Sequence, residues 1–119
     1  GYTFIAPNLN NDGHDTPLPV ATNWLSGFLS PLLANKGVMD STLIVVTFDE
    51  SANTTRGSVM GSRKPNVIYT VLLGNMVKTG SRSTVPYNHF SLLRTIELNF
   101  GLSPSVAPAG TQPIEGIWR

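Results

Sequence analysis

Apolar residues along the chain form three short runs that have the features of β-strands. These runs cover residues 2–6, 42–48 and 67–73, and each ends in a polar or glycine-containing loop. The second and third runs are apolar almost throughout, which is typical of strands that are buried on both faces of a parallel sheet. The sequence therefore predicts three buried strands.

Two further segments have the spacing of amphipathic helices. Apolar side chains recur in steps of about four through residues 22–33, and Pro31 interrupts this stripe. The proline predicts either a kink or the cap of a second short turn, and Gly37 is the expected helix end. A second helix is predicted for residues 89–100, with Gly101 as its stop.

Strands that are interleaved with helices and long polar loops indicate an α/β fold with a mostly parallel, helix-flanked sheet. Two helices are too few to cover both faces of such a sheet. We therefore expect an incomplete domain, which is completed by a missing N-terminal portion or by other copies of the chain. Residues 104–119 contain three prolines and are predicted to be a C-terminal coil that Ile117 and Trp118 anchor.

Composition narrows the possible partners. The 119 residues suffice for one domain, and 13% are charged, about half the share of an average soluble domain. A net charge of +1 predicts no strong attraction to nucleic acid or anionic membranes. No apolar run approaches the roughly 18–20 residues of a membrane span. Cysteine is absent, which excludes disulfides and thiolate metal sites.

Acidic residues gather in two loops that each follow a predicted strand. Asp12 and Asp15 flank His14 in the first loop, and Asp49 and Glu50 are adjacent in the second. Loops at the carboxyl ends of parallel strands converge, and clustered carboxylates repel unless a cation or protons compensate them. This pattern predicts a divalent-metal or catalytic site. The alternative is ordinary turn chemistry, since Asp–Gly is a common turn and Asp often caps helices.

Three other polar features also bear on function. His89 is the first residue of the last predicted helix. It is either a surface residue beside the helix cap or a third contributor to the site that the two acidic loops are predicted to form. Asn53 begins an Asn-Thr-Thr sequon, which permits N-glycosylation on a secretory route. A basic group forms either a solvated loop or a positive rim for a phosphorylated substrate. Its members are Arg56, Arg63, Lys64, Lys78 and Arg82.

Four stretches occur in an order that resembles a known family: APNLNNDGHDT, STLIVVTFDES, VLLG and YNHFSLLRTIELNFGL. They are similar to the C-terminal part of the phosphoesterase family of phospholipases C and acid phosphatases, whose fold resembles that of the alkaline phosphatase superfamily. The resemblance covers residues 1–103, and the first stretch is most similar to fungal acid phosphatases. It implies metal-assisted hydrolysis of phosphorylated small molecules or lipids, in which a Ser or Thr attacks phosphorus.

The resemblance also implies roles for individual residues. Asp49 and Glu50 would hold a divalent metal ion of unknown identity, and His14, with Asp15 beside it, would contact the substrate phosphate or the metal. His89 matches the family's late active-site histidine. The family's early Glu-Asn metal motif and its nucleophile segment do not occur in these 119 residues.

We therefore expect the chain to supply half of an active site and to be inactive by itself. It would belong to a secreted or cell-wall acid phosphatase or phospholipase C-like enzyme. The alternative is a non-catalytic, self-assembling or structural module that is derived from the same half-fold.

Overall fold

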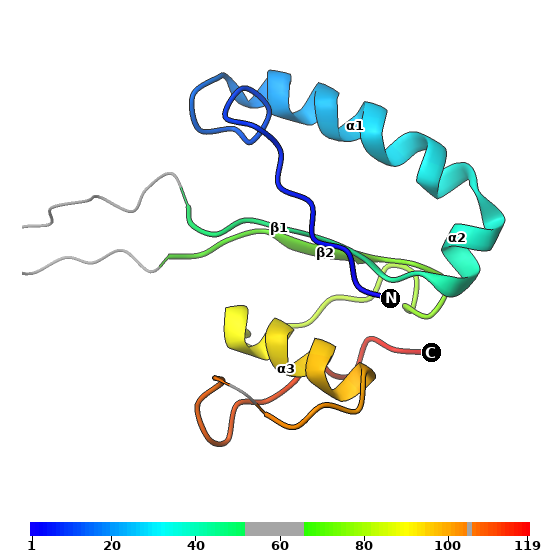
Figure 1. Cartoon of the computed structure of the whole chain (residues 1–119), viewed down its shortest axis with the longest axis vertical. Coiled ribbons are helices and arrows are strands. Elements are labelled where there is room, and N and C mark those ends of the chain that lie inside the picture. Colours follow the sequence, from blue (N-terminus) through cyan, green and yellow to red (C-terminus); the bar gives the residue numbers. More distant parts are fainter. Residues whose placement is uncertain (52–65, 105) are drawn as a thin grey trace, which may run out of the picture. The chain divides into compact units, whose positions relative to one another are not determined.

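The computed structural model describes residues 1–51, 66–104 and 106–119. The chain divides into two compact units, Gly1–Thr42 and Leu43–Arg119, which are described here one at a time. The first unit contains the helices α1 and α2, and the second contains the strands β1 and β2 and the helix α3 (Figure 1). No helix within these described ranges is both long and apolar enough to cross a bilayer.

Helix α1 (Leu18–Ala34) is longer than the apolar stripe predicted. It begins directly after Pro17, and proline at the second helical position suits a helix start, where the missing N–H would have no intrahelical partner. Pro31 removes one bond from the helical ladder, but the helix continues to Ala34. The rings of Trp24 and Phe28 stack on one side of the helix, with centroids 5.5 Å apart.

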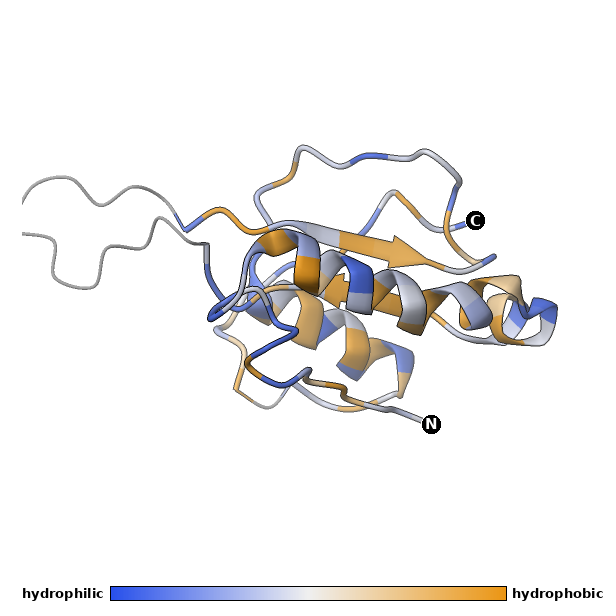
Figure 2. Cartoon of the chain, turned by 90° about the horizontal axis from the view of Figure 1, so that it is seen from above, coloured by the Kyte–Doolittle hydropathy of each residue, from blue (hydrophilic) through white to orange (hydrophobic). Residues whose placement is uncertain are grey.

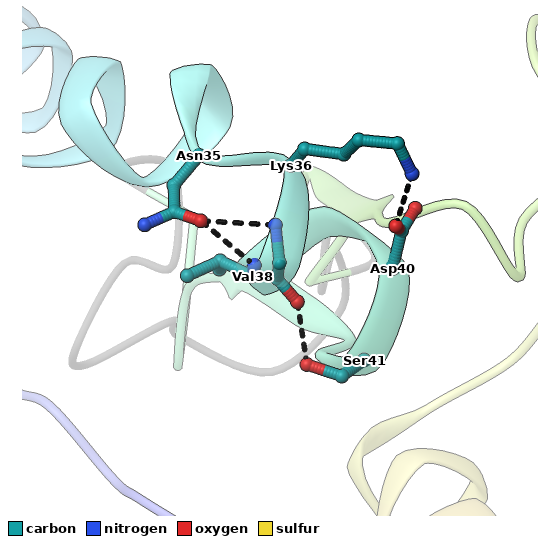
Figure 3. Close-up of polar contacts among 6 residues, drawn as sticks. Asn35, Lys36, Val38, Asp40 and Ser41 are labelled. Carbon is teal, nitrogen blue, oxygen red and sulfur yellow. Dashed lines mark hydrogen bonds and ion pairs between the residues drawn. The ribbon is translucent and has the colours of Figure 1, made fainter.

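Helix α2 (Lys36–Ser41) corrects the prediction that Gly37 ends a helix, because Gly37 lies in the first turn of α2. The side chain of Asn35 caps this turn by accepting hydrogen bonds from the N–H groups of Gly37 (2.9 Å) and Val38 (3.2 Å) (Figure 3). Lys36 and Asp40 form an ion pair one turn apart. An asparagine cap therefore separates two helices where the sequence suggested the end of one.

Strands β1 (Ile44–Thr47) and β2 (Thr70–Leu73) correct the predicted parallel arrangement, because they pair antiparallel in the register Ile44↔Leu73 to Thr47↔Thr70. Continuous apolar runs are compatible with either direction. A parallel pair needs a long crossover, usually a helix, whereas an antiparallel pair can be joined by a loop, and the sequence of residues 48–69 has no helical spacing of apolar residues. The α/β class is confirmed, and a larger, mostly parallel sheet stays a prediction.

Residues 2–6 form no strand, which is a second correction. Phe4 is 79% exposed, and within the described ranges no backbone bond joins this segment to a strand. The strands β1 and β2 are coloured as apolar over much of their length in Figure 2, but their residues are only half-buried or exposed. Neither strand is buried on both faces within this chain, and their burial in a completed domain stays a prediction.

Helix α3 (His89–Asn99) confirms the last predicted helix and its stop. A capping box closes its start: the side chain of Asn88 accepts from the Ser91 N–H, and the Ser91 hydroxyl accepts from the Asn88 N–H. At its end Gly101 has a φ of +65°, which favours glycine. The Leu102 N–H bonds the Glu97 carbonyl, which completes a Schellman motif.

The C-terminal segment packs within the second unit, as predicted from Ile117 and Trp118. Ile114 and Ile117 are buried, and the indole N–H of Trp118 donates to the Ile114 carbonyl at 2.8 Å. The Ile114 N–H donates to the Thr95 hydroxyl on α3, and an isolated antiparallel bridge joins Trp118 to Val77. The predicted domain boundary at residue 103 stays a prediction.

Candidate active site at the end of strand β1

The two predicted metal ligands lie in a bend that directly follows β1. The last ladder pair is Thr47 and Thr70, whose hydroxyls are hydrogen-bonded at 2.7 Å. Residues 48–51, which we call the acidic bend, then leave the sheet, and Asp49 and Glu50 are exposed. The chain therefore presents two adjacent carboxylates to solvent at the end of a hydrogen-bonded strand.

Asn66 spans the base of the acidic bend. Its side-chain oxygen accepts the Ser51 N–H at 2.6 Å, and its amide nitrogen lies 3.5 Å from the Asp49 carbonyl oxygen, to which it donates weakly. If the β1–β2 register is continued, Ser51 and Asn66 stand opposite each other. The Asn66 side chain thus bonds where the backbone ladder has ended.

His89 reaches the same bend from the first position of α3. Its Nε2 lies 2.9 Å from the backbone carbonyl oxygen of Asp49, a contact between residues 40 positions apart. A carbonyl oxygen can only accept, so Nε2 carries the proton in this bond. In the neutral ring the lone pair is therefore on Nδ1, the nitrogen that can accept a proton or bind a metal.

The carboxylates of Asp49 and Glu50 fit a hard divalent cation by their chemistry. Neither has a hydrogen bond or ion pair with another side chain in the described ranges, and carboxylate oxygens are the donors that Mg²⁺ and Ca²⁺ prefer. The same ranges contain no group of three or more His, Cys, Asp or Glu side chains able to hold a metal. The bend therefore offers part of a ligand set.

The other predicted site residues lie in the first unit, in the polar loop of residues 7–17. The Asp15 carboxylate accepts a hydrogen bond from His14 Nδ1 at 2.8 Å, and the Asp12 carboxylate accepts the His14 N–H at 2.8 Å. Both side chains of the His14–Asp15 pair are well exposed, at 75% and 51%. With Nδ1 protonated, the neutral His14 ring has its lone pair on Nε2.

The structure thus brings some of the predicted site residues into contact, whereas other predicted contacts stay predictions. Asp49 and Glu50 share a bend that His89 contacts, and His14 is paired with Asp15. The approach of His14 to Asp49 stays a prediction. Lys78 donates to the Gly116 carbonyl, which favours a structural role for this member of the basic group. Asn53, Arg56, Arg63 and Lys64 lie outside the described residues.

Sequence reasoning missed two polar contributors to the second unit. Asn66 gave only the weak signal of an asparagine just before a strand. Glu97 is buried at 3% exposure and pairs with Arg94 at 3.3 Å, and the three-residue spacing on α3 was a signal that could have identified this pair. Asn66 joins the segment before β2 to the acidic bend, and the Arg94–Glu97 pair lies within α3.

Comparison with known proteins places the chain in a family. Residues 1–103 match the model of the phosphoesterase family. The chain belongs to the phosphoesterase family. No solved structure matches it.

Curated relatives include fungal acid phosphatases. The chain is 39% identical to a probable acid phosphatase of Kluyveromyces lactis and 40% identical to an acid phosphatase of Aspergillus niger, each over 104 residues. These matches cover 85% of this chain and 23% of each relative. A phosphatidylinositol-3-phosphatase of Mycobacterium tuberculosis is 32% identical over 98% of this chain and 35% of that relative. The chain therefore spans less than a quarter of the fungal relatives' length.

Proposed function

We propose that the protein hydrolyses phosphate esters with the help of a divalent cation, and that this chain contributes the acidic bend and two histidines to its active site. Family membership and the acid phosphatases among its relatives support the reaction class. The observation that carries the proposal is the hydrogen bond from His89 to the Asp49 carbonyl. This bond joins the acidic bend to the histidine at the start of α3.

In this proposal Asp49 and Glu50 hold the cation through their carboxylates. Both are exposed, and neither is engaged by another described side chain, so each is available as an oxygen ligand. When bound, the cation would stabilise the negative charge on the transferred phosphoryl group. The carboxylates would also be relieved of their mutual repulsion, which explains two adjacent acids at the end of a strand.

The histidines are proposed to handle protons and phosphate oxygens through opposite ring nitrogens. Asp49 fixes His89 through Nε2, so Nδ1 is the atom that accepts or returns a proton. Asp15 fixes His14 through Nδ1, so Nε2 is the atom directed to a substrate phosphate or to the metal. In each case the hydrogen-bond acceptor selects the tautomer.

We further propose that the nucleophile and the remaining metal ligands lie outside these 119 residues. The matches to the fungal acid phosphatases cover only 23% of each relative, so most of an enzyme of that length would lie outside this chain. A larger, mostly parallel sheet of the alkaline phosphatase type would place those groups near the acidic bend, since loops at one end of such a sheet converge. The β1–β2 pair would then form one portion of that sheet.

The proposed substrates are phosphate esters of small molecules or of lipids. The names of the fungal relatives specify acid phosphatases, and the mycobacterial relative is named for a phosphorylated lipid. Secretion or attachment to a cell wall, with glycosylation at Asn53, belongs to the same proposal. Mass spectrometry of the natural protein before and after glycosidase treatment tests the modification.

A metal-removal experiment tests the proposed reaction. The full-length polypeptide is assayed with p-nitrophenyl phosphate, then dialysed against a chelator and supplied in turn with Mg²⁺, Mn²⁺, Ca²⁺ and Zn²⁺. We expect hydrolysis to disappear on chelation and to return with at least one cation. Parallel assays with vesicles that contain a phosphoinositide distinguish a lipid substrate from a soluble one. Full activity after complete metal removal would refute the metal role.

A second candidate function is a non-catalytic, self-assembling module, and one observation favours it. Several large apolar side chains of the described residues are exposed, among them Phe4 at 79%, Val67 at 74% and Tyr69 at 69%. Such surface is usually covered by protein. Intact mass and light scattering of the natural protein decide between the two: one long chain with hydrolytic activity supports the enzyme, and an inactive oligomer of 119-residue chains supports the module.

A further inference from the structure

We propose that Asn66 is a positioning residue that fixes the backbone of the acidic bend, so that the Asp49 and Glu50 carboxylates are held in place for a cation. This inference rests on the proposed function for its purpose. The Asn66 side chain makes two hydrogen bonds to the bend, one with the Ser51 N–H at 2.6 Å and one with the Asp49 carbonyl at 3.5 Å. We call this pair of bonds the clamp.

The position of Asn66 in the register explains why an amide side chain is needed. An antiparallel pair holds its strands by backbone bonds, and the ladder here ends at Thr47 and Thr70. Beyond that point the bend is exposed, and water competes for its N–H and C=O groups. Asn66 replaces the missing ladder bond with a side-chain bond to Ser51, two positions beyond Asp49.

The two functional groups of the amide bond both sides of Glu50. The oxygen holds the N–H of Ser51, which follows Glu50, and the nitrogen reaches the carbonyl of Asp49, which precedes it. Aspartate has no donor for the second bond, and alanine has neither group. Asparagine is therefore the residue type that ties the bend at two points without adding a negative charge beside two carboxylates.

His89 makes the clamp a three-element junction. Its Nε2 donates to the same Asp49 carbonyl that Asn66 reaches, so the lead-in to β2 and the start of α3 meet at one atom of the bend. The Asn88–Ser91 capping box fixes the first turn of α3 and with it the place of His89. Asn66 and His89 thus restrain the backbone, while the carboxylates themselves stay unengaged by other described side chains.

The test compares Asn66→Ala and Asn66→Asp with Asn23→Ala in the full-length polypeptide. Asn23 is an exposed asparagine on α1 and serves as the matched control. Hydrogen exchange of the peptide that contains Ser51 measures the clamp, and calorimetric titration with Mn²⁺ measures the cation site. We expect Asn66→Ala to speed exchange in this peptide and to weaken Mn²⁺ binding by about 10–100-fold, the usual effect of losing a group that orients ligands.

The Asn66→Asp variant distinguishes loss of the bend's restraint from a general loss of stability. Asn66→Asp keeps the acceptor for the Ser51 N–H, so exchange should stay close to that of the wild type even if Asn66→Ala proves unstable. Faster exchange in Asn66→Ala with unchanged Mn²⁺ affinity would overturn the positioning role, and unchanged exchange would overturn the clamp. If the wild type binds no cation, the proposed metal role fails, while the exchange data still decide whether Asn66 holds the bend.

Discussion

Two acidic loops of this chain carry similar residues but are held in different ways. In the polar loop of the first unit, the hydrogen bonds that Asn, Asp and Thr side chains make with other described residues join positions at most six apart. In the acidic bend, the bonds that restrain the backbone come from residues 15 and 40 positions away. A polar loop rich in asparagine and aspartate can thus organise itself, whereas the bend depends on the fold around it.

This difference predicts where mutations will have distant effects. A change in the polar loop should alter the chemistry of that loop and little else. A change at the acidic bend, or at the elements that hold it, should be detected in other segments of the second unit. Four experiments test this comparison.

The largest effect is expected for Asp49→Ala. Removing one of the two carboxylates should lower cation binding and reduce turnover of p-nitrophenyl phosphate by more than about 100-fold, because groups that only orient metal ligands are already worth about 10–100-fold. Asp40→Ala is the matched control, since Asp40 pairs with Lys36 on the surface of α2. Normal turnover and normal metal content in Asp49→Ala would remove this residue from the site.

A comparison of His89→Asn with His14→Asn distinguishes the two loops most directly. Each variant should lower turnover by about 100-fold, the lower end of what a general acid or base contributes, if its histidine takes part in proton transfer. Of the two variants, we expect His89→Asn alone to speed hydrogen exchange in the acidic bend as well, because the His89 ring bonds the Asp49 backbone carbonyl. Equal exchange in the two variants would contradict the long-range restraint proposed for the bend.

Thr95→Val is expected to have an intermediate effect on stability. The Thr95 hydroxyl accepts the Ile114 N–H at 2.8 Å, and Ile114 is buried. Leaving that N–H without its acceptor should cost about 1–3 kcal/mol in the free energy of unfolding. Thr95→Ser keeps the hydroxyl and is the control. Chemical denaturation of the full-length polypeptide provides the measurement, and equal stability of the two variants would argue against this anchor.

The smallest effect is expected for Asn35→Ala in the first unit. The lost cap bonds to Gly37 and Val38 are local, and such caps contribute about 1 kcal/mol. Hydrogen exchange should become faster in the first turn of α2 only. Faster exchange in the acidic bend would show that the first unit also restrains the second, and would weaken the contrast between the two loops.

Much of the local structure was predictable because the responsible signals lie close together in sequence. Asn88, Ser91 and Gly101 define the ends of α3 through bonds within one turn, so the helix was placed correctly. The family was likewise identified from short stretches, and the comparison confirms it over residues 1–103. Asp49, Glu50 and His89 could be named as candidates from their motifs alone.

The strand direction and the contact of Asn66 could not be predicted from the sequence pattern. The apolar runs that became β1 and β2 suit parallel and antiparallel pairing equally, so only the fold decided that Thr47 meets Thr70. That same pairing set Asn66 opposite Ser51, across a segment with no periodic signal.

The sequence by itself therefore determined which residues are candidates for a cation site, and where the last helix begins and ends. Capping bonds and turn preferences act over a few residues and leave a readable pattern. Tertiary structure decided which distant groups restrain the acidic bend, because the hydrogen bond between His89 and the Asp49 carbonyl joins residues 40 positions apart and exists only in the folded chain. Strand direction and the role of Asn66 belong to the same class of long-range outcomes.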